Sequence, residues 1–64
     1  MDEKLLTPAE LAEYLHTTTG NLAQMRFQGT GPAFIKAGRK VLYAESDIRT
    51  WLAAGRRTQS GSAA

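Results

Sequence analysis

The 64-residue sequence predicts a small α+β domain of three short helices and one β-hairpin. Two observations predict this class. Three segments, near residues 8–16, 18–28 and 46–54, combine helix start or stop signals with apolar residues at helical spacing. Between the second and the third, two β-prone runs flank a glycine-containing turn. A chain this short has room for one domain, which we place at residues 1–54, with a flexible polar tail over residues 55–64.

The first helix is predicted from a strong start signal. Thr7 can cap the helix, Pro8 suits its first position, and Glu10 completes a capping box. The helix is expected to end near His16, because three threonines and a glycine follow.

The second helix is expected to begin after an N-cap at Thr18 and to run to about Gln28, where Gly29 ends it. Leu22 and Met25 supply its inward face. Two short helices joined by a turn of three or four residues form the helix-turn-helix arrangement.

The period then becomes strand-like. Residues 34–36 and 41–43 are β-prone runs on either side of Gly38, and this spacing predicts a tight hairpin. Residues 5–6 are expected to form a short extended lead-in to the first helix. A hairpin alone is marginal in water, so this one must lean on the helices.

The third helix is expected to open at Ser46 or the residue before it and to close at Gly55, with Asp47 in its positive first turn. Tyr14 and Tyr43 are expected to be half-buried with their hydroxyls in water, and Phe27 to place most of its area in the core. The predicted core consists of Leu11, Leu15, Leu22, Ile35, Leu42, Ile48, Trp51 and Leu52.

Composition excludes several classes of site and function. The sequence has no cysteine and one histidine, so we expect neither a disulfide nor a metal site, and no cofactor. No apolar run is long enough to span a bilayer, and the start MDEKLL does not resemble a signal peptide, so we expect a cytoplasmic protein. An enzyme is not expected, because His16 has no nucleophile arranged with it, and helix termini account for Glu10 and Asp47.

Charge is distributed unequally along the chain. Residues 1–15 hold four acids and one lysine, whereas residues 16–44 hold four bases and no acid. A segment free of carboxylates has the sign expected of a surface that meets a polyanion, although four bases in 29 residues can also form an ordinary solvated face.

Three segments in order, LLTPAELAEYL, TTTGNLAQMRFQGTGP and FIKAGRKVLYAESDIRTWL, resemble the excisionase-type, MerR-like winged helix-turn-helix domains of bacteria, phages and integrative elements. The resemblance spans residues 5–54, and its most specific part is the hairpin, or wing, with the helix start that follows. The chain departs from the pattern at His16, where the family usually has glycine, at Met25, where many relatives have tryptophan, and at Gly20, where a polar or charged residue is frequent.

The resemblance implies that the second helix lies in the major groove of double-stranded DNA. The helix face opposite Leu22 and Met25 includes Gln24, whose amide can both donate to and accept from adenine. Asn21 offers the same chemistry or caps the helix. We expect Thr18 and Thr19 to contact a phosphate, and Arg26 to reach a backbone phosphate from the flank. The outward face consists of Thr19, Gly20, Ala23, Gln24 and Phe27. Phe27 either stacks against sugars of the DNA or completes the core, and we expect the core to hold most of its area.

The wing is expected to contact the minor groove or the backbone. Gly38 permits the turn, Arg39 suits a narrow minor groove, and Lys36 and Lys40 are either phosphate contacts or solvated lysines. In the tail, residues 56–57 are two arginines that either add a nonspecific phosphate contact or keep the end soluble.

The resemblance implies a sequence-specific architectural protein, an excisionase or recombination directionality factor. Such a protein would bind adjacent sites cooperatively, bend DNA and direct a cognate integrase towards excision in a bacterial host cell. A small winged-helix transcriptional regulator is the alternative, since it needs the same groove contacts. A protein-interaction module that does not bind DNA is a remote alternative, because it leaves the basic wing unexplained.

Overall fold

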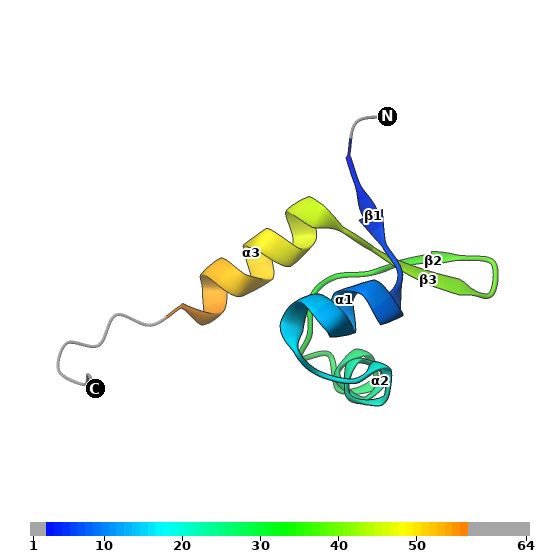
Figure 1. Cartoon of the computed structure of the whole chain (residues 1–64), viewed down its shortest axis with the longest axis horizontal. Helices are drawn as coiled ribbons and strands as arrows, with labels where there is room; N and C mark the ends of the chain where they lie inside the picture. Colours follow the sequence, from blue (N-terminus) through cyan, green and yellow to red (C-terminus); the bar gives the residue numbers. More distant parts are fainter. Residues whose placement is uncertain (1–2, 57–64) are drawn as a thin grey trace, which may run out of the picture.

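A computed structural model describes residues 3–56, and Figure 1 shows how its elements are arranged. Three helices and a three-stranded antiparallel sheet confirm the α+β class of a winged helix-turn-helix. Of the predicted tail, only residues 55–56 lie within the described part of the chain. The elements in order are β1 (Leu5–Leu6), α1 (Pro8–Leu15), α2 (Thr19–Gln28), β2 (Ile35–Ala37), β3 (Lys40–Ala44) and α3 (Glu45–Gly55).

The sheet has the order β1-β3-β2, so β3 is its central strand. β1 pairs with the end of β3, with Leu5 opposite Ala44, and β2 pairs with its start, with Lys36 opposite Val41. The extended lead-in predicted at residues 5–6 is therefore a strand of the sheet. It supplies the third strand that a lone hairpin needs for stability.

The hairpin turns on two residues, Gly38 and Arg39. Gly38 has φ +64°, a region in which glycine carries no penalty for a Cβ atom. A positive φ at the first central position alone is the pattern of a type II′ turn, whose twist suits the flanking strands.

Both helices of the helix-turn-helix begin and end where the sequence predicts. At the start of α1, Thr7 Oγ1 accepts from the Glu10 backbone N–H at 3.1 Å, and the Thr7 N–H donates to Glu10 Oε1 at 2.9 Å. Thr18 caps α2, and Gly29 ends it with φ +74°. His16, which follows α1, has φ +60°, so a histidine occupies the left-handed region in which glycine is usual at a helix end.

The start of α3 depends on a residue far away in the sequence. Its N-cap residue, Ala44, has no side-chain hydrogen bond to offer. Instead, the Glu3 carboxylate accepts from the Ser46 backbone N–H at 3.0 Å and from the Ser46 hydroxyl. The bond from the Ser46 hydroxyl, and to a smaller extent the bond from its N–H, hold the pKa of Glu3 below its ordinary value of 4.5. The positive charge of Arg49 lowers this pKa slightly further.

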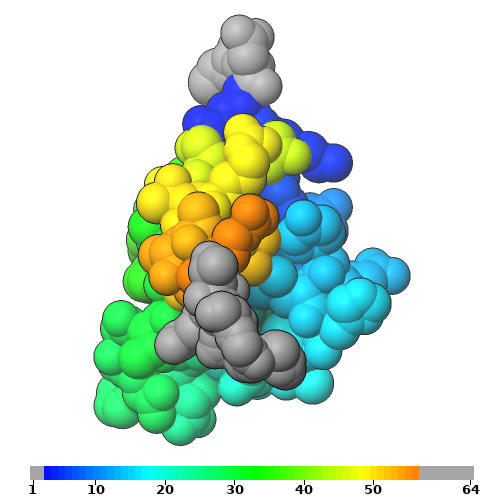
Figure 2. Space-filling model, turned by 90° about the vertical axis from the view of Figure 1, so that its left-hand side faces the viewer, coloured from blue at the N-terminus to red at the C-terminus, as the bar shows by residue number. Residues whose placement is uncertain are grey.

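α3 includes Gly55, and its C-cap is Arg56, so the helix runs one residue further than its predicted end. Figure 2 views the molecule from the side at which α3 extends, with α1 on one side of it and residues near position 30 on the other. The Trp51 indole N–H donates to the Thr30 carbonyl at 3.0 Å, which ties α3 to the loop after α2.

The core is small and lies where α1, α2, β3 and α3 meet. Its fully buried large side chains are Leu11, Leu22 and Tyr43, joined by Ala12 and Ile48. Leu6, Leu15, Met25 and Val41 are partly buried against this cluster. Leu42 and Trp51, also expected in the core, are partly buried.

Two of the predicted core residues are exposed. Ile35 pairs with Leu42, which lies on the sheet face opposite Tyr43 because alternate residues of a strand point to opposite faces. Tyr43 lies on the sheet face that packs against the helices, so Ile35 lies on the other face and is exposed. α3 extends away from the rest of the molecule (Figure 1), and Leu52, in its C-terminal half, is exposed at the hollow beside Tyr14.

Three aromatic residues also differ from expectation. Tyr43 is fully buried rather than half-buried, because it follows Val41 by two positions on the core face of β3. Phe27 is 90% exposed, since it points away from the face of α2 that carries Leu22. Tyr14 is 62% exposed and faces a hollow between α1 and α3.

Candidate nucleic-acid interface

The second helix of the helix-turn-helix presents one long face to solvent. Leu22 is fully buried, and Met25 and Arg26 are partly buried, which fixes the inward side of α2. Among the residues predicted to face outward, Gln24 and Phe27 carry the long side chains. The residues of this outward face are Thr19, Gly20, Ala23, Gln24 and Phe27, and all five are exposed.

Polar groups cluster at the N-terminus of α2. Thr18 Oγ1 accepts from the Asn21 backbone N–H at 3.0 Å, which confirms its capping role. The Asn21 side-chain amide donates to Thr17 Oγ1 at 2.9 Å, so one of its hydrogens is held by the turn. Exposed N–H groups at a helix N-terminus favour an anion, and Thr18, Thr19 and Asn21 are all exposed there.

Arg26 lies between α2 and the sheet. Its Nη1 donates to the Tyr43 hydroxyl at 2.7 Å, and its guanidinium carbon lies 5.9 Å from the centre of the Phe34 ring. Phe34 and Tyr43 are themselves 6.5 Å apart between ring centres, in a tilted arrangement. Arg26 is the residue that we expect to reach a backbone phosphate from the flank of α2. In the folded domain its guanidinium joins α2 to β3, the central strand of the sheet.

This cluster was not predicted from the sequence, although two signals pointed to it. Arg26 follows Leu22 by four positions, so it lies on the inward side of α2. Tyr43 alternates with Val41 in a strand, which places both on one sheet face. Together these signals place an arginine and a tyrosine on facing surfaces.

The wing carries basic side chains on both of its faces. Lys36 lies opposite Val41 and Lys40 lies opposite Ala37, so the two lysines point to opposite sides of the hairpin, with Arg39 at its tip. These three bases are exposed, as is Gly38. Residues 16–44, which contain α2 and the whole wing, hold no aspartate or glutamate. The wing therefore has a positive potential.

α2 and the wing lie together on one part of the molecule. In Figure 1, α2 is seen end-on beneath α1, the hairpin projects to the right, and α3 extends to the left. The Arg26–Tyr43 bond and the Phe34 contact connect α2 to the base of the hairpin. These contacts hold the inward side of α2 against the base of the hairpin, so they fix the position of the helix relative to the wing.

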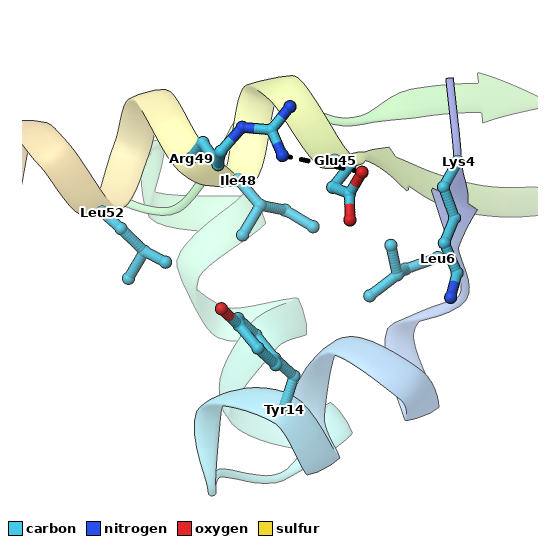
Figure 3. A pocket seen from close by; sticks show the side chains of 7 residues that line it. All are labelled: Lys4, Leu6, Tyr14, Glu45, Ile48, Arg49 and Leu52. Atoms are coloured by element: carbon cyan, nitrogen blue, oxygen red, sulfur yellow. Dashed lines mark ion pairs between the residues drawn. The ribbon is translucent and has the colours of Figure 1, made fainter. Parts of the chain in front are cut away.

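A separate hollow of about 300 Å³ lies between α1 and α3. Figure 3 shows Tyr14 reaching from α1 towards Ile48 and Leu52 of α3, with an Arg49–Glu45 ion pair of 3.6 Å along the rim. Within residues 3–56, no three His, Asp or Glu side chains gather as metal ligands would, and no helix is long and apolar enough to cross a membrane.

A comparison with family models identifies the module that this geometry forms. The model of the helix-turn-helix domain family matches residues 5–56. The chain belongs to this family. A helix-turn-helix domain binds double-stranded DNA through its second helix, so the match supports DNA as the partner of α2. A search of curated proteins found no match to this helix-turn-helix domain.

Proposed function

We propose that this helix-turn-helix domain binds DNA with α2 in the major groove and the hairpin tip in the neighbouring minor groove or against its backbone. The observation that supports the proposal is an exposed face of α2 together with a wing that carries three exposed bases. The Arg26–Tyr43 bond holds the inward side of α2 against β3 and so fixes the helix relative to the wing. Because residues 16–44 hold no carboxylate, none from that segment opposes a phosphate on this surface.

In this proposal Gln24 reads an adenine, and Asn21 is a second candidate for base contact through its carbonyl oxygen. Thr18 and Thr19 contact a phosphate beside the start of α2. Arg39 enters the minor groove, and Lys36 and Lys40 contact phosphates. The full set of residues proposed to contact DNA is Thr18, Thr19, Gly20, Asn21, Gln24, Arg26, Lys36, Gly38, Arg39 and Lys40.

For the biological role, we propose an excisionase-type architectural factor. The support is the resemblance of three consecutive segments, above all the wing and the start of α3. A single module of this size covers roughly 600–1,000 Å² of DNA and binds weakly alone. Cooperative binding of several copies at adjacent sites, or contact with a cognate integrase, would supply the missing affinity. Such a protein would act in the cytoplasm of a bacterial host, where its DNA is.

The DNA-binding proposal is tested by selecting duplexes from a random pool and titrating the best one at several salt concentrations. Three wing bases and Arg26 predict that log K falls with log salt at a slope of about −3 to −4. Arg39→Ala should lower affinity and reduce the slope by about 1, with helical content unchanged. Arg49→Ala is the matched control, because Arg49 lies on α3 and pairs with Glu45. Binding that is insensitive to salt would contradict the proposal.

Specificity is tested with Gln24→Ala on the same duplex. The variant should lose about 1–3 kcal/mol of discrimination at one base pair and keep its preferences elsewhere. Wild-type discrimination at every base pair would exclude Gln24 from readout.

The role is tested by an excision assay with the integrase encoded on the same genetic element. An excisionase should increase excision and protect several adjacent sites in a footprint. The alternative, a small transcriptional regulator, is favoured if the protein changes transcription from a neighbouring promoter and leaves excision unchanged.

A further inference from the structure

Phe27 is the most exposed of the large apolar side chains in residues 3–56, at 90% of its area. It lies in a regular ten-residue helix, not in a loop or at a chain end. A phenylalanine ring in water gains free energy from any surface that covers it. The exposed ring therefore offers apolar area that a partner surface can cover.

The orientation of Phe27 follows from the helix itself. Leu22 is fully buried, and Arg26 points to Tyr43 on the sheet. Phe27 comes five residues after Leu22, which rotates it about 140° around the helix axis. No substitution of a surface residue could turn the ring inward without turning Leu22 out of the core.

Phe27 shares the outward face of α2 with Gln24, which precedes it by three positions, and with Ala23, which precedes it by four. Gly20 lies on the same face one turn earlier. Glycine and alanine let the helix backbone approach a surface closely. The two long side chains, Gln24 and Phe27, therefore reach furthest from this face and lie side by side.

We propose that Phe27 is an apolar specificity residue whose ring contacts the C5-methyl group of a thymine next to the base read by Gln24. The inference rests on the proposed DNA binding with α2 in the major groove. The methyl group of thymine is the one apolar feature that a base pair presents in that groove. The position of Phe27 beside an amide, on a helix face of small residues and in a segment without carboxylates, favours a base edge over an acidic or apolar protein partner.

The test replaces each thymine of the selected duplex in turn with deoxyuridine, which removes only the methyl group. For the wild-type protein, one replacement should weaken binding about 3- to 5-fold, the effect expected from one methyl-sized group. Phe27→Ala should weaken binding to the thymine duplex and show no further loss at that position. Gln24→Ala should keep the uracil effect. Tyr14→Ala removes an exposed aromatic from α1 and is the matched control, with an unchanged uracil effect.

Phe27→Ala should also keep the wild-type melting temperature, since its side chain makes little contact in the folded domain. The inference is overturned if no thymine replacement distinguishes the wild type from Phe27→Ala, or if the selected site contains no fixed thymine. It is also overturned if Phe27→Ala abolishes cooperativity between adjacent sites while single-site affinity is unchanged, because the ring would then contact a second copy. Salt-sensitive binding by the wild type in these cases leaves the proposed function intact, whereas its absence removes both.

Discussion

Tyr43→Phe should destabilise the domain although it removes only one oxygen atom. Tyr43 is fully buried, and its hydroxyl accepts from Arg26 Nη1 at 2.7 Å. The ring remains in the variant, so packing against Phe34 is preserved. The loss therefore measures the hydrogen bond between α2 and β3.

The magnitude follows from the burial of the two partners. A hydrogen bond to a charged group contributes about 1.5–3 kcal/mol to stability when it is well shielded. Arg26 is only partly buried, so water can replace part of the lost contact and we expect about 1–2 kcal/mol. For a domain of this size, each kcal/mol corresponds to roughly 4–8 °C in melting temperature.

The assay is a double-mutant cycle measured by thermal or urea denaturation. Arg26→Met keeps an unbranched apolar stem and removes the guanidinium. In that background the Tyr43 hydroxyl is buried without its donor, so Tyr43→Phe should be neutral or stabilising. Tyr43→Phe should thus lower stability in the wild type but not in Arg26→Met, and this difference identifies the Arg26–Tyr43 bond.

Equal destabilisation by Tyr43→Phe in both backgrounds would refute this reasoning. It would mean that the hydroxyl acts through something other than Arg26. A neutral Tyr43→Phe in the wild-type background would show that Tyr43 contributes only its volume.

Two further predictions concern the helix ends. Glu3→Gln should lower the melting temperature at pH 7, because the carboxylate that caps α3 is lost. The pKa of Glu3 is lowered in the folded state, so its stabilisation is complete above the ordinary value of 4.5 and is lost as the pH falls through the lowered value. Melting curves of the variant and the wild type should converge in acid, and a constant difference down to pH 2 would contradict the cap. His16→Gly should stabilise the domain by up to about 1 kcal/mol, since φ +60° strains any side chain with a Cβ atom, although glycine also makes the unfolded chain more flexible. His16→Val should destabilise it, and a glycine variant that melts below the valine variant would exclude backbone strain at this position.

The sequence was a good guide wherever the signal is local. The caps at Thr7 and Thr18 and the glycine at Gly29 act within four residues of themselves, so their motifs predict the helix ends closely. The hairpin turn at Gly38 is equally local. Contacts between distant residues were missed, because no short motif encodes them. Glu3 and Ser46 are 43 positions apart, and Arg26 and Tyr43 are 17 apart.

Burial was predicted less well because the domain is too thin to cover every apolar residue. Ile35 and Leu52 have the residue type of core positions, yet one lies on the open face of the sheet and the other on an extended part of α3. Phe27 is exposed for a different reason, since the helix rotation set by Leu22 decides it. The predicted contact residues of α2 and the wing are exposed except for Arg26, which is partly buried.

The hydrogen bonds from Ser46 to Glu3 join the first described residue to the beginning of the last helix. A further bond, from the Glu45 N–H to the Lys4 carbonyl, reinforces this closure. Fraying of β1 and of the residues before it therefore removes the acceptors for the first N–H groups of α3. Unwinding of the start of α3 in turn releases the segment that leads into β1. Unfolding of the N-terminal segment and of the start of α3 is therefore coupled, although Glu3 and Ser46 lie 43 positions apart in the sequence.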